Sequence, residues 1–176
     1  MSAASTDAGE SRAGIRTIAT PEDMHALGRE LAARLRAGDL LVLSGPLGAG
    51  KTQLVRGIGE GLNVRGPITS PTFVLARTHP SLVGGPALVH ADAYRLGSAA
   101  ELDDLDLDFA NAVVAVEWGA GLLDGVAESY LTIEIARREG DAPLGGDEEL
   151  DDGPEPRTVT IAGHGPRWAD GAASRD

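Results

Sequence analysis

Residues 45–52 are the part of the sequence whose residue types and spacing most clearly predict chemistry. They read Gly-Pro-Leu-Gly-Ala-Gly-Lys-Thr and match the pattern G-x-x-x-x-G-K-[ST] in full. Glycines allow such a loop to curl until successive backbone N–H groups point into one concavity, which suits a phosphate group. We expect Lys51 to reach the β- and γ-phosphates of a nucleotide and the Thr52 hydroxyl to bind Mg²⁺.

The lysine content of the chain favours this interpretation over a glycine-rich turn that matches by chance. Lys51 is the only lysine, and the other fourteen of the fifteen basic residues are arginines. A compact ammonium group fits between phosphates where a planar guanidinium does not. The sequence therefore retains lysine at the one position where this chemistry requires it.

Two carboxylates follow apolar segments and could complete the site. Val113–Val116 is a hydrophobic run that ends in Glu117, which is the Walker-B pattern with Glu in place of Asp. Asp92 follows a similar run that includes His90, which we interpret as a packing residue more readily than as a base. Carboxyl ends of parallel strands meet at the edge where ligands bind, so we expect Glu117 and Asp92 beside the glycine-rich loop. The alternative is that each is a solvated acid at a strand end.

Residues 69–72, Thr-Ser-Pro-Thr, form a stiff segment in which Pro71 keeps Ser70 extended. A hydroxyl such as that of Thr72 could sense a γ-phosphate as switch loops do, although a capped turn explains the same residues. Trp118, directly after Glu117, is typical of a core or of a partner surface.

The hydrophobic pattern predicts the elements that must position these residues. Thr20 and Pro21 predict the start of a helix that ends near 37–39, and a second helix follows the glycine-rich loop to about Gly61. An acidic helix is expected around Leu102, Leu105 and Phe109. Apolar or alternating runs predict strands at 15–18, 40–43, 73–77, 87–90, 111–116, 130–136 and 158–161. The fold class is therefore α/β and P-loop NTPase-like, with a mainly parallel central sheet flanked by helices. The last two strands are expected to form an antiparallel C-terminal edge pair.

Composition predicts one domain over 15–165, a disordered tail at 1–14 and a flexible tail at 166–176. The net charge of −12 is mostly local, because 101–108 holds five acids and 139–155 holds eight, with no base in either. We expect 139–156 to be an acidic mobile loop. The acidic balance argues against a protein that wraps DNA or RNA, and the absence of cysteine excludes disulfides and thiolate sites. No run is long enough to span a membrane, and no secretory signal is visible, so a cytoplasmic protein is expected.

Four motifs, in this order, resemble the TsaE family (formerly YjeE), which are small bacterial P-loop ATPases needed to make threonylcarbamoyladenosine on tRNA. The first is the glycine-rich loop itself. The others are Ser-Pro-Thr-Phe at 70–73, His-Ala-Asp-Ala-Tyr-Arg-Leu at 90–96 and Val-Glu-Trp at 116–118. The resemblance covers roughly residues 15–162.

The resemblance implies site residues and partners. ATP would be bound by Gly45, Gly48, Ala49, Gly50, Lys51, Thr52 and the backbone N–H of Gln53, with Ser70 and Trp118 beside the site. Thr52 and Glu117 would hold Mg²⁺, and Lys51, Asp92, Glu117 and Thr72 would serve hydrolysis, Asp92 as a water-orienting or metal-linked acid. The partners would be TsaD and TsaB, with tRNA reached only through them and no contact with DNA or membrane.

Two other functions remain open at this point. A small-molecule or nucleoside kinase also uses a glycine-rich loop on a small α/β domain, but needs an acceptor pocket and a lid that carries arginine. The long loop at 139–155 is acidic and would repel ATP, which weighs against a kinase. A non-catalytic nucleotide-binding adaptor would bind ATP to fix a partner surface and would not need Asp92.

Overall fold

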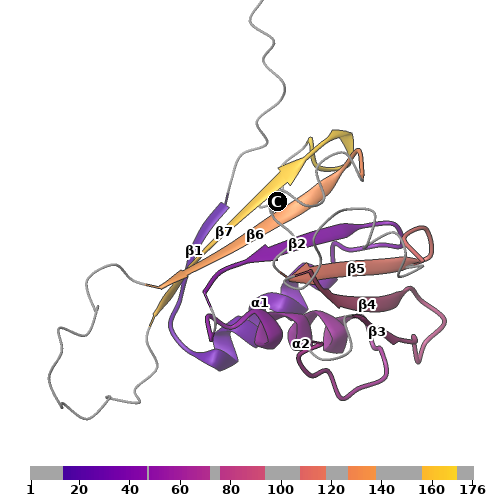
Figure 1. Cartoon of the computed structure of the whole chain (residues 1–176), viewed down its shortest axis with the longest axis horizontal. Coiled ribbons are helices and arrows are strands. Elements are labelled where there is room, and N and C mark those ends of the chain that lie inside the picture. The colour runs from indigo at the N-terminus through magenta and orange to yellow at the C-terminus, as the bar shows by residue number, and fades with distance from the viewer. Residues whose placement is uncertain are drawn as a thin grey trace, which may run out of the picture.

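A single twisted sheet runs through the molecule, with strands in the order β1-β7-β6-β2-β5-β4-β3 (Figure 1). The computed structural model describes residues 14–46, 48–71, 76–93, 108–117, 127–137 and 156–169. The strands are β1 (Gly14–Ile18), β2 (Leu40–Ser44), β3 (Ala76–His79), β4 (Ala87–Asp92), β5 (Ala112–Glu117), β6 (Tyr130–Arg137) and β7 (Arg157–His164). The helices are α1 (Pro21–Ala32), α2 (Lys51–Gly61) and the short 3-10 helix η1 (Pro166–Trp168).

The centre of the sheet is parallel, as the buried apolar runs predict. β2 pairs in parallel with β5 on one side and with β6 on the other, and β4 pairs in parallel with β5. Every residue of β5 is buried, and four of the five residues of β2 are. These strands carry near-continuous hydrophobic runs because both of their faces are covered.

The prediction of an antiparallel pair at the C-terminal edge is only partly right. β6 and β7 do pair antiparallel along their whole length, but β6 also joins β2, and β1 covers the outer side of β7. The other edge is antiparallel too, because β3 pairs with β4 in that direction. The described strand β3 begins at Ala76 and ends at His79, whereas we expected a strand over 73–77, of which 73–75 lie outside the described residues.

Helices α1 and α2 lie side by side on one face of the sheet, which we call the helix side (Figure 1). Thr20 begins α1 as predicted, since its side chain accepts a hydrogen bond from the Asp23 N–H at 3.1 Å. The predicted end near 37–39 is too late, because α1 ends at Ala32. Beyond it the Asp39 carboxylate accepts a hydrogen bond from the Arg36 N–H at 2.8 Å and stabilises a turn.

The opposite face of the sheet has its own apolar cluster, built on Val42, Val89 and Val114, with Phe109 and Tyr130 packed against it. In the described ranges both α-helices cover the helix side. Of the acidic helix predicted around Leu102, Leu105 and Phe109, the first two positions lie outside the described residues, and Phe109 lies in a turn before β5 instead of a helix.

Glycines allow α1 and α2 to pack with their backbones in direct contact. A Cβ atom on Gly57 would lie 2.0 Å from the His25 carbonyl oxygen, and one on Gly28 would lie 2.3 Å from that of Leu54. Neither position leaves room for a larger residue, because backbone atoms cannot yield as a flexible side chain can. This contact fixes α2 against α1 and so fixes the loop that begins α2.

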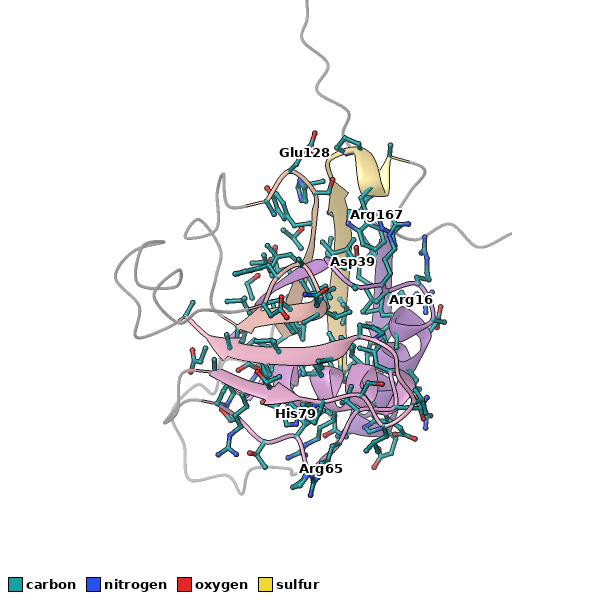
Figure 2. The ribbon with its side chains drawn as sticks, turned by 90° about the vertical axis from the view of Figure 1, so that its right-hand side faces the viewer. Arg16, Asp39, Arg65, His79, Glu128 and Arg167 are labelled. Atoms are coloured by element: carbon teal, nitrogen blue, oxygen red, sulfur yellow. The ribbon has the colours of Figure 1, made fainter. Side chains whose placement is uncertain are left out.

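The C-terminal segment begins with packed structure, so the prediction of a flexible tail from residue 166 is wrong for 166–169. Trp168 is 3% exposed, and the Arg167 guanidinium donates to Asp39 at 3.2 Å and to the Arg34 carbonyl at 2.9 Å. Figure 2 shows Arg167 next to Asp39. An arginine paired with a buried carboxylate anchors the segment, which composition does not reveal.

Of the tail predicted at 1–14 and the loop predicted at 139–156, residues 1–13 and 139–155 lie outside the described residues, as do 170–176, while Gly14 is the first residue of β1. No helix in the described ranges is long and apolar enough to cross a membrane.

Candidate functional site

The glycine-rich loop (residues 45–52) joins the carboxyl end of β2 to the start of α2. Gly48 and Gly50 have φ angles of +75° and +110°, a backbone conformation that residues with a side chain rarely adopt. Gly50 is the N-cap of α2, so the loop curls onto the end of the helix where backbone N–H groups are unpaired. The loop therefore has the turn conformation and the helix N-terminus that the motif predicts, an arrangement that suits an anion.

Lys51 is buried against this loop. Lys51 is only 6% exposed, and its Nζ donates to the Gly45 carbonyl at 2.7 Å and to the Pro46 carbonyl at 3.0 Å. Burial lowers the pKa of the Lys51 ammonium, and the nearby carboxylates of Glu117 and Asp92 partly oppose that shift. The cation is therefore held at the loop and has two negative charges close to it.

Asp92 and Glu117 lie opposite each other as register partners at the carboxyl ends of β4 and β5. Both are buried, at 2% and 3% exposure, and strand alternation places both on the helix side. The Thr52 hydroxyl is 3.4 Å from Glu117 Oε1. The structure thus brings Lys51, Thr52, Asp92 and Glu117 to one edge of the sheet.

The donor set fits Mg²⁺ better than a metal that needs an all-protein cage. Thr52 and Glu117 offer a hydroxyl and a carboxylate oxygen in contact with each other. No group of three or more His, Cys, Asp or Glu side chains that could hold a metal is present among the described residues. Magnesium typically uses one or two protein oxygens and completes its shell with phosphate and water, so these residues suit it.

His90 is a residue of the site that we expected to be a packing residue. It is fully buried, and its Nε2 faces Glu117 Oε1 at 3.5 Å. Neither ring nitrogen makes a hydrogen bond within the described part of the chain. The signal in the sequence was its spacing, because a residue two positions before Asp92 in a strand shares the same face.

The remaining predicted residues are placed less centrally. Ala49 is buried in the core, and the Gln53 side chain accepts a hydrogen bond from Arg56 at 3.3 Å along α2. Arg56 also donates to the Ile68 carbonyl at 2.8 Å, which ties α2 to the segment that carries the exposed Ser70. Thr72 and Trp118 lie outside the described residues. A further residue that we did not predict, Arg137, lies beside Gly48.

Comparison with known proteins identifies the family. The family described as "Threonylcarbamoyl adenosine biosynthesis protein TsaE" matches residues 18–143. A tRNA threonylcarbamoyladenosine biosynthesis protein TsaE from Streptomyces coelicolor is 54% identical over 149 residues, covering 83% of this chain and 94% of that protein. A protein of the same name from Bacillus subtilis is 36% identical over 129 residues, covering 72% and 78% of the two chains.

A solved structure has a fold similar to that of this chain. The crystal structure of Bacillus subtilis YdiB superposes with a TM-score of 0.66 at 28% identity and covers 90% of each chain. The resemblance inferred from the four sequence motifs is thus confirmed at the level of the family. The chain belongs to the TsaE family.

Proposed function

We propose that this chain binds Mg²⁺-ATP in a P-loop NTPase-like site and hydrolyses it, in the synthesis of threonylcarbamoyladenosine on tRNA. The observation that carries the proposal is the meeting of the glycine-rich loop with Lys51, Thr52, Asp92 and Glu117 at one sheet edge. Membership of the TsaE family supports the pathway, because the relatives are named for it.

The loop and Lys51 would bind the phosphates. Backbone N–H groups from Gly48 to Thr52 would donate to phosphate oxygens, and the helix dipole of α2 favours negative charge there. The Lys51 ammonium would exchange the carbonyls of Gly45 and Pro46 for phosphate oxygens. Because burial lowers its pKa, the charged form gains more from a phosphate than an exposed lysine would.

Thr52 and Glu117 would hold Mg²⁺, Glu117 directly or through water. When bound, the ion neutralises charge on the β- and γ-phosphate oxygens. His90 faces Glu117 from the buried side and would restrict the directions its carboxylate can take.

Asp92 would serve the hydrolytic step itself, by orienting the attacking water or by an indirect link to the metal. It is buried beside Glu117 and close enough to Lys51 to oppose, in part, the lowering of the ammonium's pKa by burial. A carboxylate at this position can accept a hydrogen bond from a water molecule beside the phosphates that the glycine-rich loop would hold.

The partners in this proposal are TsaD and TsaB, which would hold the tRNA. The acidic character of the chain, with a net charge of −12, suits contact with basic proteins better than direct contact with RNA. Hydrolysis would then be slow in the isolated chain and faster in the complex.

A capture experiment tests the proposal. Immobilised chain is mixed with TsaD–TsaB in the presence of Mg²⁺ and ATP, ADP or no nucleotide. We expect ATP-dependent capture, and equal capture without nucleotide would contradict coupling to ATP. A parallel assay with candidate hydroxyl acceptors separates the kinase alternative, since phosphoryl transfer faster than phosphate release would contradict an ATPase.

A further inference from the structure

Arg137 is the last residue of β6 and lies alongside the glycine-rich loop. β6 runs parallel to β2, with Leu43 opposite Ile133 and Ser44 opposite Glu134. β2 ends at Ser44, so the last three residues of β6 extend beside the loop that follows it. Two segments far apart in the sequence are therefore neighbours at the carboxyl end of β2.

Strand alternation sends the Arg137 side chain to the same face as the loop. Leu131, Ile133 and Ile135 are fully or almost fully buried in the core on the helix side. Arg137 continues that row by one more step of two residues, so its side chain also leaves the sheet on the helix side. These side chains of β6 therefore change from apolar to cationic where the core ends and the glycine-rich loop begins.

Close contacts confirm that β6 and the loop touch. A Cβ atom on Gly45 would lie 2.6 Å from the Ile135 carbonyl oxygen. A Cβ atom on Gly48 would lie 3.2 Å from Nη2 of Arg137. The guanidinium therefore lies directly against Gly48, and the residue as a whole is exposed to solvent.

The charges of the site leave a role for a second cation. Among the described residues, the buried titratable groups here are the two carboxylates of Asp92 and Glu117, the ammonium of Lys51 and the ring of His90. Mg²⁺-ATP is itself anionic, so these groups alone would leave the loaded site strongly negative. Arginine presents several N–H donors in a planar fork that matches phosphate oxygens.

We propose that Arg137 is a second phosphate-binding cation, whose guanidinium donates hydrogen bonds to phosphate oxygens of the nucleotide bound in the glycine-rich loop. The inference rests on the proposed function and extends it to a strand that the motif does not include. It also explains why β6 ends in a basic residue after three alternating positions in the core.

Affinity measurements on three variants test the inference. Binding of ATP and of inorganic tripolyphosphate is measured calorimetrically for the unaltered chain and for Arg137→Gln, Arg137→Lys and Arg36→Gln. Arg36→Gln is the control, because it changes the net charge by the same amount as Arg137→Gln. Arg36 is exposed and lies before β2, at the end of that strand opposite the glycine-rich loop. A charge-assisted hydrogen bond corresponds to about tenfold to hundredfold in affinity.

We expect Arg137→Gln to weaken both ligands by about that factor, Arg137→Lys to weaken them less, and Arg36→Gln to stay within about twofold. A loss for ATP without a loss for tripolyphosphate would assign Arg137 to the base or ribose and overturn the inference. Equal effects of Arg137→Gln and Arg36→Gln would also overturn it. If the unaltered chain binds neither ligand, the proposed function fails as well, whereas binding that Arg137→Gln leaves unchanged overturns this inference alone.

Discussion

Asp92 and Glu117 are register partners on two neighbouring parallel strands, and both carboxylates are buried on the helix side within reach of α2. Two buried carboxylates in adjacent strands repel each other unless cations compensate them. Lys51 is one such cation: burial lowers the pKa of its ammonium, and both carboxylates partly oppose that shift. Lys51 therefore compensates part of the negative charge of this pair.

The amide variants Asp92→Asn and Glu117→Gln should separate the roles of these two acids. Glu117→Gln should raise the Mg²⁺ concentration needed for tight ATP binding, because an amide oxygen is a weaker ligand than a carboxylate. Asp92→Asn should leave ATP affinity nearly unchanged and lower hydrolysis by about a hundredfold or more. ATP titrations at several Mg²⁺ concentrations, combined with phosphate release, measure both. An equal shift of the Mg²⁺ dependence in both variants would place Asp92 on the metal.

Replacement of His90 should affect Mg²⁺-dependent ATP binding without lowering the stability of the fold. Its ring is fully buried, and within the described residues neither nitrogen has a hydrogen bond, which costs about 1–3 kcal/mol for such a group. We expect His90→Leu to keep or increase the free energy of unfolding in urea while the Mg²⁺ dependence of ATP binding weakens. His90→Asn, which keeps a donor, should restore part of that dependence. A large loss of stability in His90→Leu would show that the residue serves packing only.

His79 should make stability depend on pH. Its Nδ1 lies 2.9 Å from the Arg65 carbonyl oxygen beneath β3 (Figure 2), and burial lowers the pKa of its ring. Electrostatic interactions with His90 and Arg77 lower that pKa further. As the pH falls, His79 in the unfolded chain takes up a proton near the ordinary histidine pKa of about 6.5, whereas His79 in the folded chain resists protonation to lower pH. Stability therefore falls as pH drops below about 6.5, and it levels off below the folded pKa.

The variant His79→Gln isolates this effect from the titration of the acids. The difference in melting temperature between the unaltered chain and the variant should shrink as pH falls from about 7.5 to about 5. Thermal unfolding followed by circular dichroism at a series of pH values measures it. A difference that stays constant over that range would contradict the assignment.

The contact between α1 and α2 should tolerate no methyl group at Gly57. A Cβ atom there would lie 2.0 Å from the His25 carbonyl, so Gly57→Ala should destabilise the fold by about 1–3 kcal/mol despite the better helix propensity of alanine. Gly85→Ala is the matched control, because its Cβ would have ordinary contact with Ser81 Oγ at 3.6 Å. Urea unfolding of both variants measures the difference, and equal midpoints would contradict the contact.

Sequence reasoning predicted the elements that carry strong local signals. The N-cap Thr20, the buried run of β2 and the motif that begins α2 all act over a few residues, so their positions follow from local chemistry. The pairing of β6 with β2, and of β1 with β7, joins segments that are distant in the chain. Alternating strands of this kind fit an edge or an interior position equally well, so their order could not be predicted.

The same distinction holds for the site. The motif and the strand-end acids predicted Lys51, Thr52, Asp92 and Glu117, and the structure brings all four together. Arg137 and the anchoring pair of Arg167 with Asp39 depend on tertiary contacts that no spacing encodes. The functional role of each site residue stays a prediction that the variants above can test.

The central claim is that the glycine-rich loop with Lys51 binds and hydrolyses ATP for a tRNA-modifying complex. The most direct measurement is the rate of phosphate release from Mg²⁺-ATP by the unaltered chain and by Lys51→Ala, each alone and with TsaD–TsaB. We predict slow release by the unaltered chain, faster release with the partners, and a loss of about a hundredfold or more in Lys51→Ala under both conditions. Partner-stimulated release that Lys51→Ala leaves unchanged would contradict the account.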